Sequence, residues 1–493
     1  LRRVRITNRA RAKRTLEVTS YAEVVLAPQA ADALHPAFTN LFVQTEILRP
    51  QRAILCTRRP RSKDEESPYM LHMMAVRGTG PTEVSFETDR MRFLGRGNTI
   101  ANPLALQGGE GGSAHALSGS QGSVLDPVVS IRSLVTLEPG GSVIIDMVSG
   151  IADTREEALI LTEKYQDRRM ADRVFGLAWT HSQVLLRQIN ASEAEAQLYG
   201  QLAGSILFAN AALRADPAVL IKNHRGQSGL WGYSISGDLP IVLLQIEDAS
   251  NIELVRQLVQ AHAYWRLKGL VVDLVIWNED NAGYRQLLHD LIMGLIAAGS
   301  EASLTDRPGG IYVRPADRIA EEDRTLFQTV ARAIITDNRG TLAEQIGGST
   351  LWQTVAPQLV PARTPRAEPP AVAPLPRPDL TFSNGLGGFT PDGREYVITT
   401  AHGQLTPTPW GNVLANPNFG AIISESGLAC TWSENAHEFR LTPWGNDPVS
   451  DSRGEAFYIR DEERGHFWSP TPLPCRGATP YVTRHGFGYS VFE

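Results

Sequence analysis

The sequence contains TWSENAHEFRLTPWGNDPVSD at residues 431–451, where Trp, Asn, Pro and Gly recur within a few positions of one another. A similar stretch, TPTPWGNVLANPNFG, precedes it at residues 406–420. Turn pairs such as Asn384-Gly385 separate short β-like runs around both stretches. We therefore predict that residues 380–493 form a β-sandwich.

Prolines crowd the chain just before this region, with eight of them between Pro357 and Pro378. Proline removes a backbone donor and fixes φ, so it interrupts helices and central strands. A proline-rich segment instead favours an extended spacer. We therefore expect residues 351–379 to be a linker between domains.

The segment before the linker, residues 153–350, is predicted to be mainly helical. It begins at Thr154, where Thr-Arg-Glu-Glu is typical of a capped helix start. Helical spacing of apolar residues predicts helices at 168–189, 194–213, 252–268, 284–298 and 321–336. Two β-like apolar runs, residues 241–246 and 270–277, interrupt these helices.

The first segment, residues 1–152, has the pattern of a second β-sandwich. Glycine, proline, asparagine and aspartate clusters separate its apolar or alternating runs. These runs lie at residues 15–26, 52–56, 70–76, 82–87, 130–137 and 142–148.

Composition excludes several classes of protein. The chain has 493 residues with 42% hydrophobic and 20% charged side chains, as expected of a globular protein of several domains. A net charge of −6 gives no cationic field for nucleic acid. Three cysteines without ligand spacing argue against a disulfide framework and a zinc site. The longest apolar runs are too short to span a bilayer, so we expect a soluble segment.

Several motifs carry a family resemblance. NGLGGF (residues 384–389), HGFGYSVFE (485–493) and the stretches quoted above are similar to the amino-terminal β-sandwich of glycoside hydrolase family 94, formerly glycosyltransferase family 36. Upstream, ETDRMRFLGRG (87–97) and GQSGLWGYSISGDLPIVL (226–243) resemble the cyclic β-1,2-glucan synthases of this family. The resemblance implies a multidomain β-sandwich plus α fold. Its β-supersandwich-like segments would flank a helical, α/α-barrel-like segment that we expect to be incomplete.

The order of two motifs is unusual for the family. In family 94 sandwiches a segment like SYAEVVLAP follows one like HGFGYSVFE, whereas here the first begins at Ser20 and the second ends at Glu493. The chain is thus expected to start in the back part of one sandwich and to stop in the front part of the next. Because each part leaves unpaired edges, we expect the two to pair with each other.

The resemblance also implies a chemistry. Members build β-1,2-glucan from UDP-glucose at the cytoplasmic face of the inner membrane, and a family 94 part sets chain length by phosphorolysis. In this inverting reaction phosphate attacks the glucosidic bond while a carboxylic acid protonates the leaving oxygen. That acid belongs to a barrel expected after Glu493, so we assign no catalytic residue. The segment itself is expected to need no cofactor or metal, since phosphate and UDP-glucose serve the full enzyme.

The implied partners are β-1,2-glucan or a related oligosaccharide and the remaining domains of the same polypeptide. Trp410, Trp444 and Trp468 lie in proline-flanked motifs and are candidates to stack on glucose rings, with Asn446 and Asp447 hydrogen-bonding the hydroxyls. The alternative is that these tryptophans form sandwich core. Homo-oligomerisation is left open.

Other candidates for sugar contact lie outside the tryptophan motifs. Arg394, His485 and Tyr489 are placed to rim a sugar cleft, or else satisfy one another on loops. Trp231 and Asp238 are either substrate-facing or structural. Asp451, at the end of the stretch 431–451, is interpreted as a charged side chain that is exposed to solvent in a turn.

Two functions therefore remain open. In the first, the chain is a carbohydrate-binding, phosphorylase-like region of a cyclic β-1,2-glucan synthase. In the second, it is a non-catalytic carbohydrate-binding or structural scaffold of a larger glycan-active enzyme.

Overall fold

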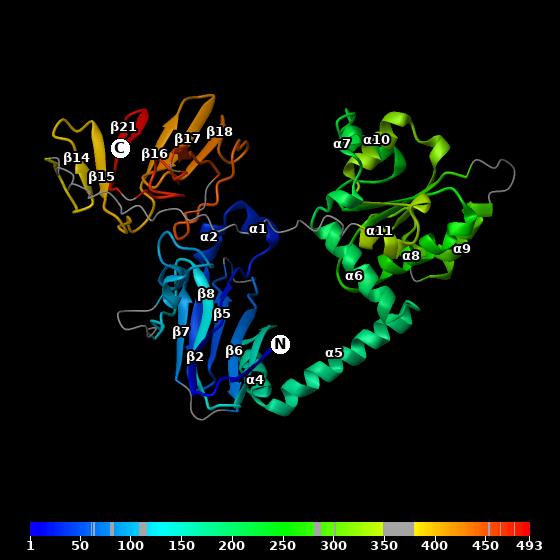
Figure 1. Cartoon of the computed structure of the whole chain (residues 1–493), viewed down its shortest axis with the longest axis horizontal. Coiled ribbons are helices and arrows are strands. Elements are labelled where there is room, and N and C mark those ends of the chain that lie inside the picture. Colours follow the sequence, from blue (N-terminus) through cyan, green and yellow to red (C-terminus); the bar gives the residue numbers. More distant parts are fainter. Residues whose placement is uncertain are drawn as a thin grey trace. The chain divides into compact units, whose positions relative to one another are not determined.

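A computed structural model gives the fold and describes residues 1–493 except 61, 63–64, 79–82, 108–115, 281–286, 300–301, 349–378, 452–453, 464 and 478. The chain divides into two compact units, one combining Leu1–Val174 with Thr364–Glu493 and the other comprising Phe175–Arg363. The expected linker, residues 351–379, lies outside the described residues except for Asp379. Sheets and helices are both present, which confirms the predicted multidomain β plus α fold (Figure 1).

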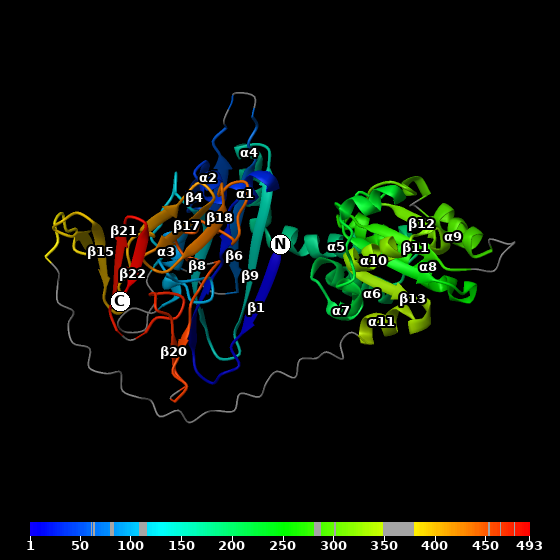
Figure 2. The same cartoon turned by 90° about the horizontal axis from the view of Figure 1, so that it is seen from above.

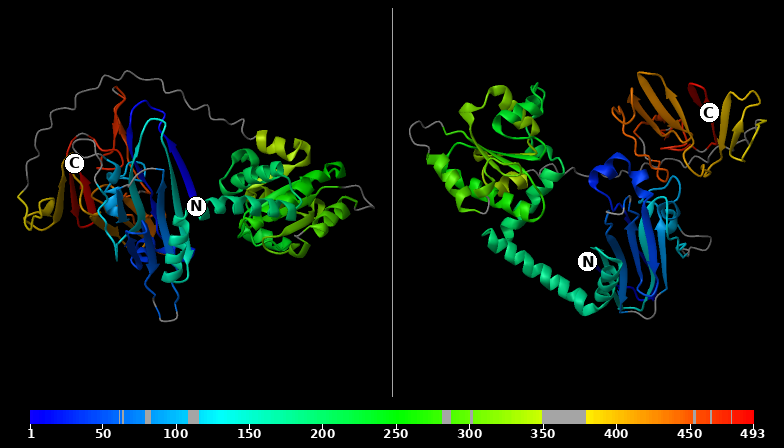
Figure 3. Two further views of the ribbon diagram at one scale, coloured as in Figure 1. Left: turned by 90° about the horizontal axis from the view of Figure 1, so that it is seen from below. Right: turned by 180° about the vertical axis from the view of Figure 1, so that it is seen from behind.

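Residues 1–152 form a sandwich of two antiparallel sheets, seen as blue and cyan strands in Figure 3. One sheet has the order β1-β9-β6-β5-β4, with strands β1 (Arg2–Thr7), β4 (Val43–Leu48), β5 (Ala53–Arg58), β6 (Tyr69–Arg77) and β9 (Ser142–Ala152). In the other, β8 (Pro127–Leu137) pairs with β2 (Arg14–Thr19), β3 (Ala22–Glu23) and β7 (Val84–Asp89). Ile54 and Ile145 of the first sheet share a buried cluster with Ile131 of the second, so the two sheets enclose one core.

Four helices accompany this sandwich: α1 (Gln29–Leu34), α2 (Pro36–Asn40), α3 (Arg90–Leu94) and α4 (Arg155–Gln166). Ala158 of α4 packs on Leu55 and Leu71, and so covers the outer face of the first sheet. The hydroxyl of Thr154 accepts a hydrogen bond from the Glu157 amide at 3.2 Å, which confirms the predicted cap.

The second unit is built on a parallel sheet of order β12-β11-β10-β13 (Figure 2). Its strands are β10 (Ile241–Ile246), β11 (Asp273–Asn278), β12 (Ile311–Pro315) and β13 (Ala333–Thr336). Its α-helices are α6 (Glu193–Leu207), α7 (Pro217–Leu220), α8 (Ile252–Leu267), α9 (Leu287–Ala298), α10 (Glu321–Val330) and α11 (Leu342–Gly348), and α5 (Arg168–Gln188) spans the boundary between the units.

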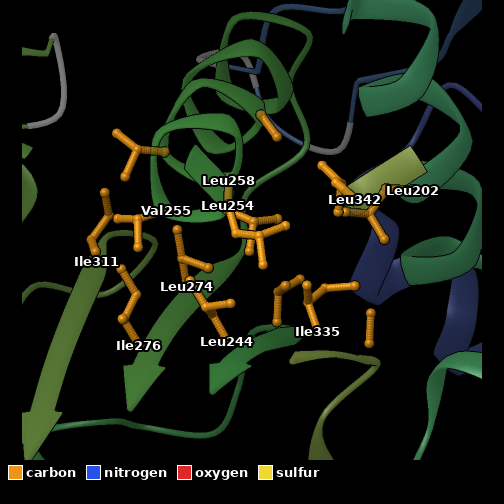
Figure 4. Packing of buried hydrophobic residues seen from close by; sticks show 14 of the residues in the cluster. Leu202, Leu244, Leu254, Val255, Leu258, Leu274, Ile276, Ile311, Ile335 and Leu342 are labelled. Atoms are coloured by element: carbon orange, nitrogen blue, oxygen red, sulfur yellow. The ribbon is translucent and has the colours of Figure 1, made fainter. Parts of the chain in front are cut away.

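Side chains of this sheet alternate between two apolar cores. Leu244 and Leu274 pack with Leu254 of α8 in one core, which Figure 4 shows at close range. Their strand neighbours Leu243 and Val275 enter the other core. Helices therefore cover both faces of the sheet, which explains why its strands are apolar on both sides.

This architecture corrects the expected helical, α/α-barrel-like segment. The two apolar runs that interrupt the predicted helices are β10 and most of β11, and the end of the predicted helix at residues 321–336 is strand β13. Short apolar runs bounded by polar residues are typical of buried parallel strands, and a parallel neighbour is reached through a crossover helix. Helices α8, α9 and α10, which lie between successive strands, are thus the crossovers of a parallel sheet.

Residues 379–493 form three small antiparallel sheets. The first has the order β14-β15-β21-β22, with β14 (Gly387–Phe389), β15 (Glu395–Thr400), β21 (Tyr481–Gly486) and β22 (Tyr489–Phe492). The others contain β16 (Gly411–Ala415), β17 (Phe419–Ser424) and β18 (Ala429–Ser433), and β19 (Ile459–Arg460) with β20 (Phe467–Trp468).

The expected pairing of the two β segments through strand edges is wrong in that form. Within the part of the chain that the structure describes, every sheet of the first unit draws its strands from one segment alone. Side-chain contacts and a backbone hydrogen bond outside the sheets join the segments instead.

Candidate functional site

The first group of candidate residues surrounds β21. His485 lies opposite Tyr396 in the β15–β21 ladder, so both side chains point to the same face. The Nε2 of His485 lies 3.1 Å from the carbonyl oxygen of Trp410, and its Nδ1 lies 2.9 Å from the hydroxyl of Ser490. Burial lowers the pKa of His485, and the contact with the Trp410 carbonyl opposes that shift. The His485 ring therefore connects the Trp410 carbonyl to the Ser490 hydroxyl.

Trp410 belongs to the same face. Its indole meets the Tyr396 ring edge-on, with ring centroids 6.0 Å apart. Trp410 as a whole residue is half-buried. The structure therefore brings Trp410 and His485 together.

Tyr489 and Arg394 lie apart from that face. Tyr489 pairs with Gly486 in the β21–β22 ladder and is 44% exposed. Its hydroxyl donates to Glu395 at 2.7 Å, and this hydrogen bond raises the pKa of Tyr489. Arg394 is exposed and its nearest carboxylate is Asp392, at 3.7 Å. Both side chains remain accessible to a ligand.

The second group is the loop of Trp444, Asn446 and Asp447. Trp444 is half-buried, and Asn446 is exposed with a left-handed φ of 45° that asparagine tolerates well. Both carboxylate oxygens of Asp447 accept hydrogen bonds from Arg90, at 2.8 and 2.9 Å. Burial acts to raise the pKa of Asp447, but the hydrogen bonds from Arg90 and Ser450 outweigh it and hold the pKa at about 2.

The remaining candidates stand separately. Trp468 pairs with Ile459 in the β19–β20 hairpin and is half-buried. In the second unit, Trp231 is 63% exposed and its indole N–H donates to the Ser236 carbonyl, while Asp238 accepts from Gln227 at 3.0 Å. Among the described residues of the first unit, no hydrogen bond or ring contact joins Trp468 to either of the two groups.

Sequence reasoning missed a buried cluster of charges between the two β segments. Arg96 donates to Glu425 at 3.2 Å and contacts Asp451 at 2.9 Å. With Arg90 and Asp447, these residues form what we call the charged joint. Burial raises the pKa of Glu425, although Thr406, the Trp410 amide and Arg96 oppose this shift.

The interpretation of Asp451 as a solvated turn charge is wrong. Its exposed fraction is 0%, and it accepts a hydrogen bond from the Ser426 hydroxyl. Arg90 and Arg96 do stand in the motif ETDRMRFLGRG, and Glu425 stands in SESG. No spacing within either motif indicates that they pair across more than 300 residues.

A second missed feature is a surface cavity of about 750 Å³ in the second unit. It lies where β10 and β13 end, which is where the strand order reverses and where open α/β sheets commonly bind ligands. The lining is polar and comprises Glu247, Asp248, Ala249, Asn251, Asp280, Asp337 and Asn338. Over the described ranges, no group of three or more His, Cys, Asp or Glu is arranged to hold a metal ion.

Of the helices in the described part of the chain, none is both long enough and apolar enough to cross a bilayer.

Comparison with known proteins places these features in a family. Residues 1–168 and 394–493 match the family described as glycosyl hydrolase 94, supersandwich domain. The whole chain is 34% identical over 501 residues to the cyclic β-(1,2)-glucan synthase of Rhizobium meliloti and covers 18% of that protein.

Several phosphorylases match a smaller part of the chain. The N,N′-diacetylchitobiose phosphorylase of Vibrio furnissii is 34% identical over 110 residues, which are 22% of this chain and 13% of that protein. The solabiose phosphorylase of Paenibacillus borealis is 35% identical over 116 residues, which are 22% of this chain and 14% of that protein. The chain spans less than a fifth of the length of each of these three relatives. Because the supersandwich match covers more than half of its residues, the chain belongs to glycosyl hydrolase family 94.

Proposed function

We propose that this chain is the β-glucan-holding region of a cyclic β-1,2-glucan synthase. The observation that carries the proposal is the 34% identity to such a synthase over the whole chain, including the second unit, which the supersandwich match does not cover. In this proposal the region binds β-1,2-glucan and supports chain-length control by phosphorolysis, while the catalytic acid lies in another part of the polypeptide.

The proposal extends to the context of the full enzyme. UDP-glucose and inorganic phosphate are its substrates, and the enzyme is anchored at the cytoplasmic face of the inner membrane. The partners of this region are the glucan and the remaining domains of the same chain.

Half-buried tryptophans support the glucan-binding part of the proposal. Trp410, Trp444 and Trp468 are each only partly buried, and stacking on a sugar ring requires a tryptophan that is partly exposed. Trp444 has the exposed Asn446 amide two residues away, and this amide can hydrogen-bond a hydroxyl. Asp447 contributes by fixing the loop, since Arg90 occupies both of its carboxylate oxygens.

Calorimetric titration of the protein with linear β-1,2-glucan tests the proposal, with β-1,3-glucan as the control ligand. We expect saturable binding of the β-1,2 polymer, lost in Trp444→Ala and retained in Trp179→Ala. Trp179 is a matched control because it is a 65% exposed tryptophan on α5, outside all the candidate groups. Absence of binding by the folded protein would contradict the proposal.

The second candidate function is a scaffold that binds no sugar. The charged joint favours this scaffold function, because polar side chains of the C-terminal motifs form ion pairs within the chain in the joint. A folded protein that fails to bind either glucan is the result that this candidate predicts.

A further inference from the structure

The short helix α3 and the loop after it carry all the residues of the first β segment that belong to the charged joint. Asp89 caps the helix by accepting from the Met91 amide at 2.9 Å. Arg90 is its first residue and Arg96 follows its end, beyond Gly95. Gly97 has a left-handed φ of 79°, and a Cβ there would come within 2.8 Å of Leu405 Cδ1. This turn is therefore shaped for close approach of the C-terminal segment.

Two of the three facing carboxylates, Asp447 and Asp451, lie in one five-residue stretch, 447–451, and the third is Glu425. Arg90 holds Asp447 at one end of the stretch, and Arg96 holds Asp451 at the other. Midway, Val449 is buried against Phe93 and Leu94 of α3. The Val449 carbonyl also accepts from the Gly97 amide at 2.7 Å. Helix α3 and the loop after it thus contact two carboxylates, at the two ends of the stretch, and the apolar side chain midway between them.

Carboxylates of the first segment position Arg90. Asp126 accepts from Arg90 at 2.9 Å, and Glu23 accepts from it at 3.0 Å. The side chain of Arg96 is only 8% exposed, so its charge is largely removed from water. A buried arginine needs carboxylate partners, and Glu425 and Asp451 of the C-terminal segment supply them.

We propose that Arg90 and Arg96 form a docking site that recognises an acidic segment of the pattern Asp-x-Val-x-Asp, and that this recognition holds residues 379–493 on residues 1–174. The covalent connection through the proline-rich residues raises the local concentration of the segment and is not needed for its docking. The segments share no strand over the residues described, and the ion pairs of Arg90 and Arg96 and the hydrogen bond from the Gly97 amide to the Val449 carbonyl connect them at this site. The stacked rings of His35 and His437, 5.7 Å apart, add a peripheral contact.

Cleavage of the full chain between the two segments tests the docking proposal. A recognition site for a sequence-specific protease replaces residues 364–370, and the cut protein is analysed by size-exclusion chromatography over a dilution series. We expect the two fragments to co-elute at micromolar concentration. In Arg90→Ala/Arg96→Ala the apparent Kd between the fragments should rise at least about 30-fold.

Two further variants guard against misfolding and nonspecific effects. Asp447→Asn/Asp451→Asn leaves residues 1–174 unchanged, and should also separate the fragments. Arg155→Ala removes an ion pair of similar geometry, to Glu46 at 2.6 Å, within the first segment alone, and the fragments should stay together. Separation of the cut wild-type fragments, or co-elution of both the arginine and the aspartate variants with unchanged Kd, would overturn the proposal.

Discussion

The parallel sheet of the second unit buries alternate apolar side chains in two cores, whereas the charged joint of the first unit buries ion pairs around a single valine. Apolar cores lose stability gradually as atoms are removed, because the remaining side chains partly relax. A buried ion pair behaves differently, since removal of one partner leaves the other charge desolvated and unpaired. The two regions should therefore respond very differently to a single substitution.

The largest effect is expected from Arg96→Ala. This change removes the arginine partner of Glu425 and Asp451, which are 2% and 0% exposed, and should lower the free energy of unfolding of the first unit by about 3–5 kcal/mol. Hydrogen exchange should show lost protection around residues 90–97 and 425–451, with that of β10 and β11 unchanged. Equal loss of protection in the parallel sheet would erase the distinction between the two regions.

Leu244→Ala tests the other side of the comparison. Leu244 is fully buried in the centre of the sheet, and its truncation should cost about 2–5 kcal/mol. The same exchange measurement should now show the loss in β10, β11 and β13 only. A matched change at the exposed Leu287 should leave protection nearly unchanged.

Acid should weaken the joint before it weakens the sheet. The pKa of Asp447 in the fold is about 2, below its ordinary value of 3.8, so its ionised form stabilises the fold. This contribution is fully present above about pH 5, and is lost as the pH falls toward 2; it amounts to about 2.5 kcal/mol. Urea unfolding of the wild type and Asp447→Asn over this range should give a difference in stability that shrinks with falling pH. A constant difference would contradict the assignment.

The smallest effect is expected away from both regions. Thr154→Ala removes the cap of α4 and should cost about 1 kcal/mol. Thermal unfolding should detect a small decrease in Tm, and Thr154→Ser should restore most of it. An effect as large as that of Arg96→Ala would mean that α4 supports the joint.

The predictable parts of the fold are those with a local signal. The run Ile241–Ile246 has an apolar side chain at all but one position, and it is a strand within the predicted bounds. Its role in a parallel sheet was missed because β12 and β13 are only five and four residues long and follow helical sequence. Pairing between strands that are far apart in the sequence depends on tertiary packing, which the spacing of apolar residues does not reveal.

The same limit applies to the candidate site. Trp410 and His485 were identified separately from their motifs, and their contact through one carbonyl depends on the register of β15 and β21. Asp447 was read as a sugar-binding carboxylate because its partner Arg90 stands in another motif, far away in the chain. Their roles in glucan binding remain predictions for the titration to test.

The separation of Arg90 and Asp447 by 357 residues also has a consequence for protein synthesis. At about 5–20 residues per second, Asp447 leaves the ribosome about 20–70 s after Arg90. All the strands of the parallel sheet are made within that interval, so the second unit can fold while the first is unfinished. During this time the surface of α3 that later contacts Val449 is uncovered. The nascent chain can therefore misassociate at α3 during this interval, and a transiently bound chaperone would protect it there.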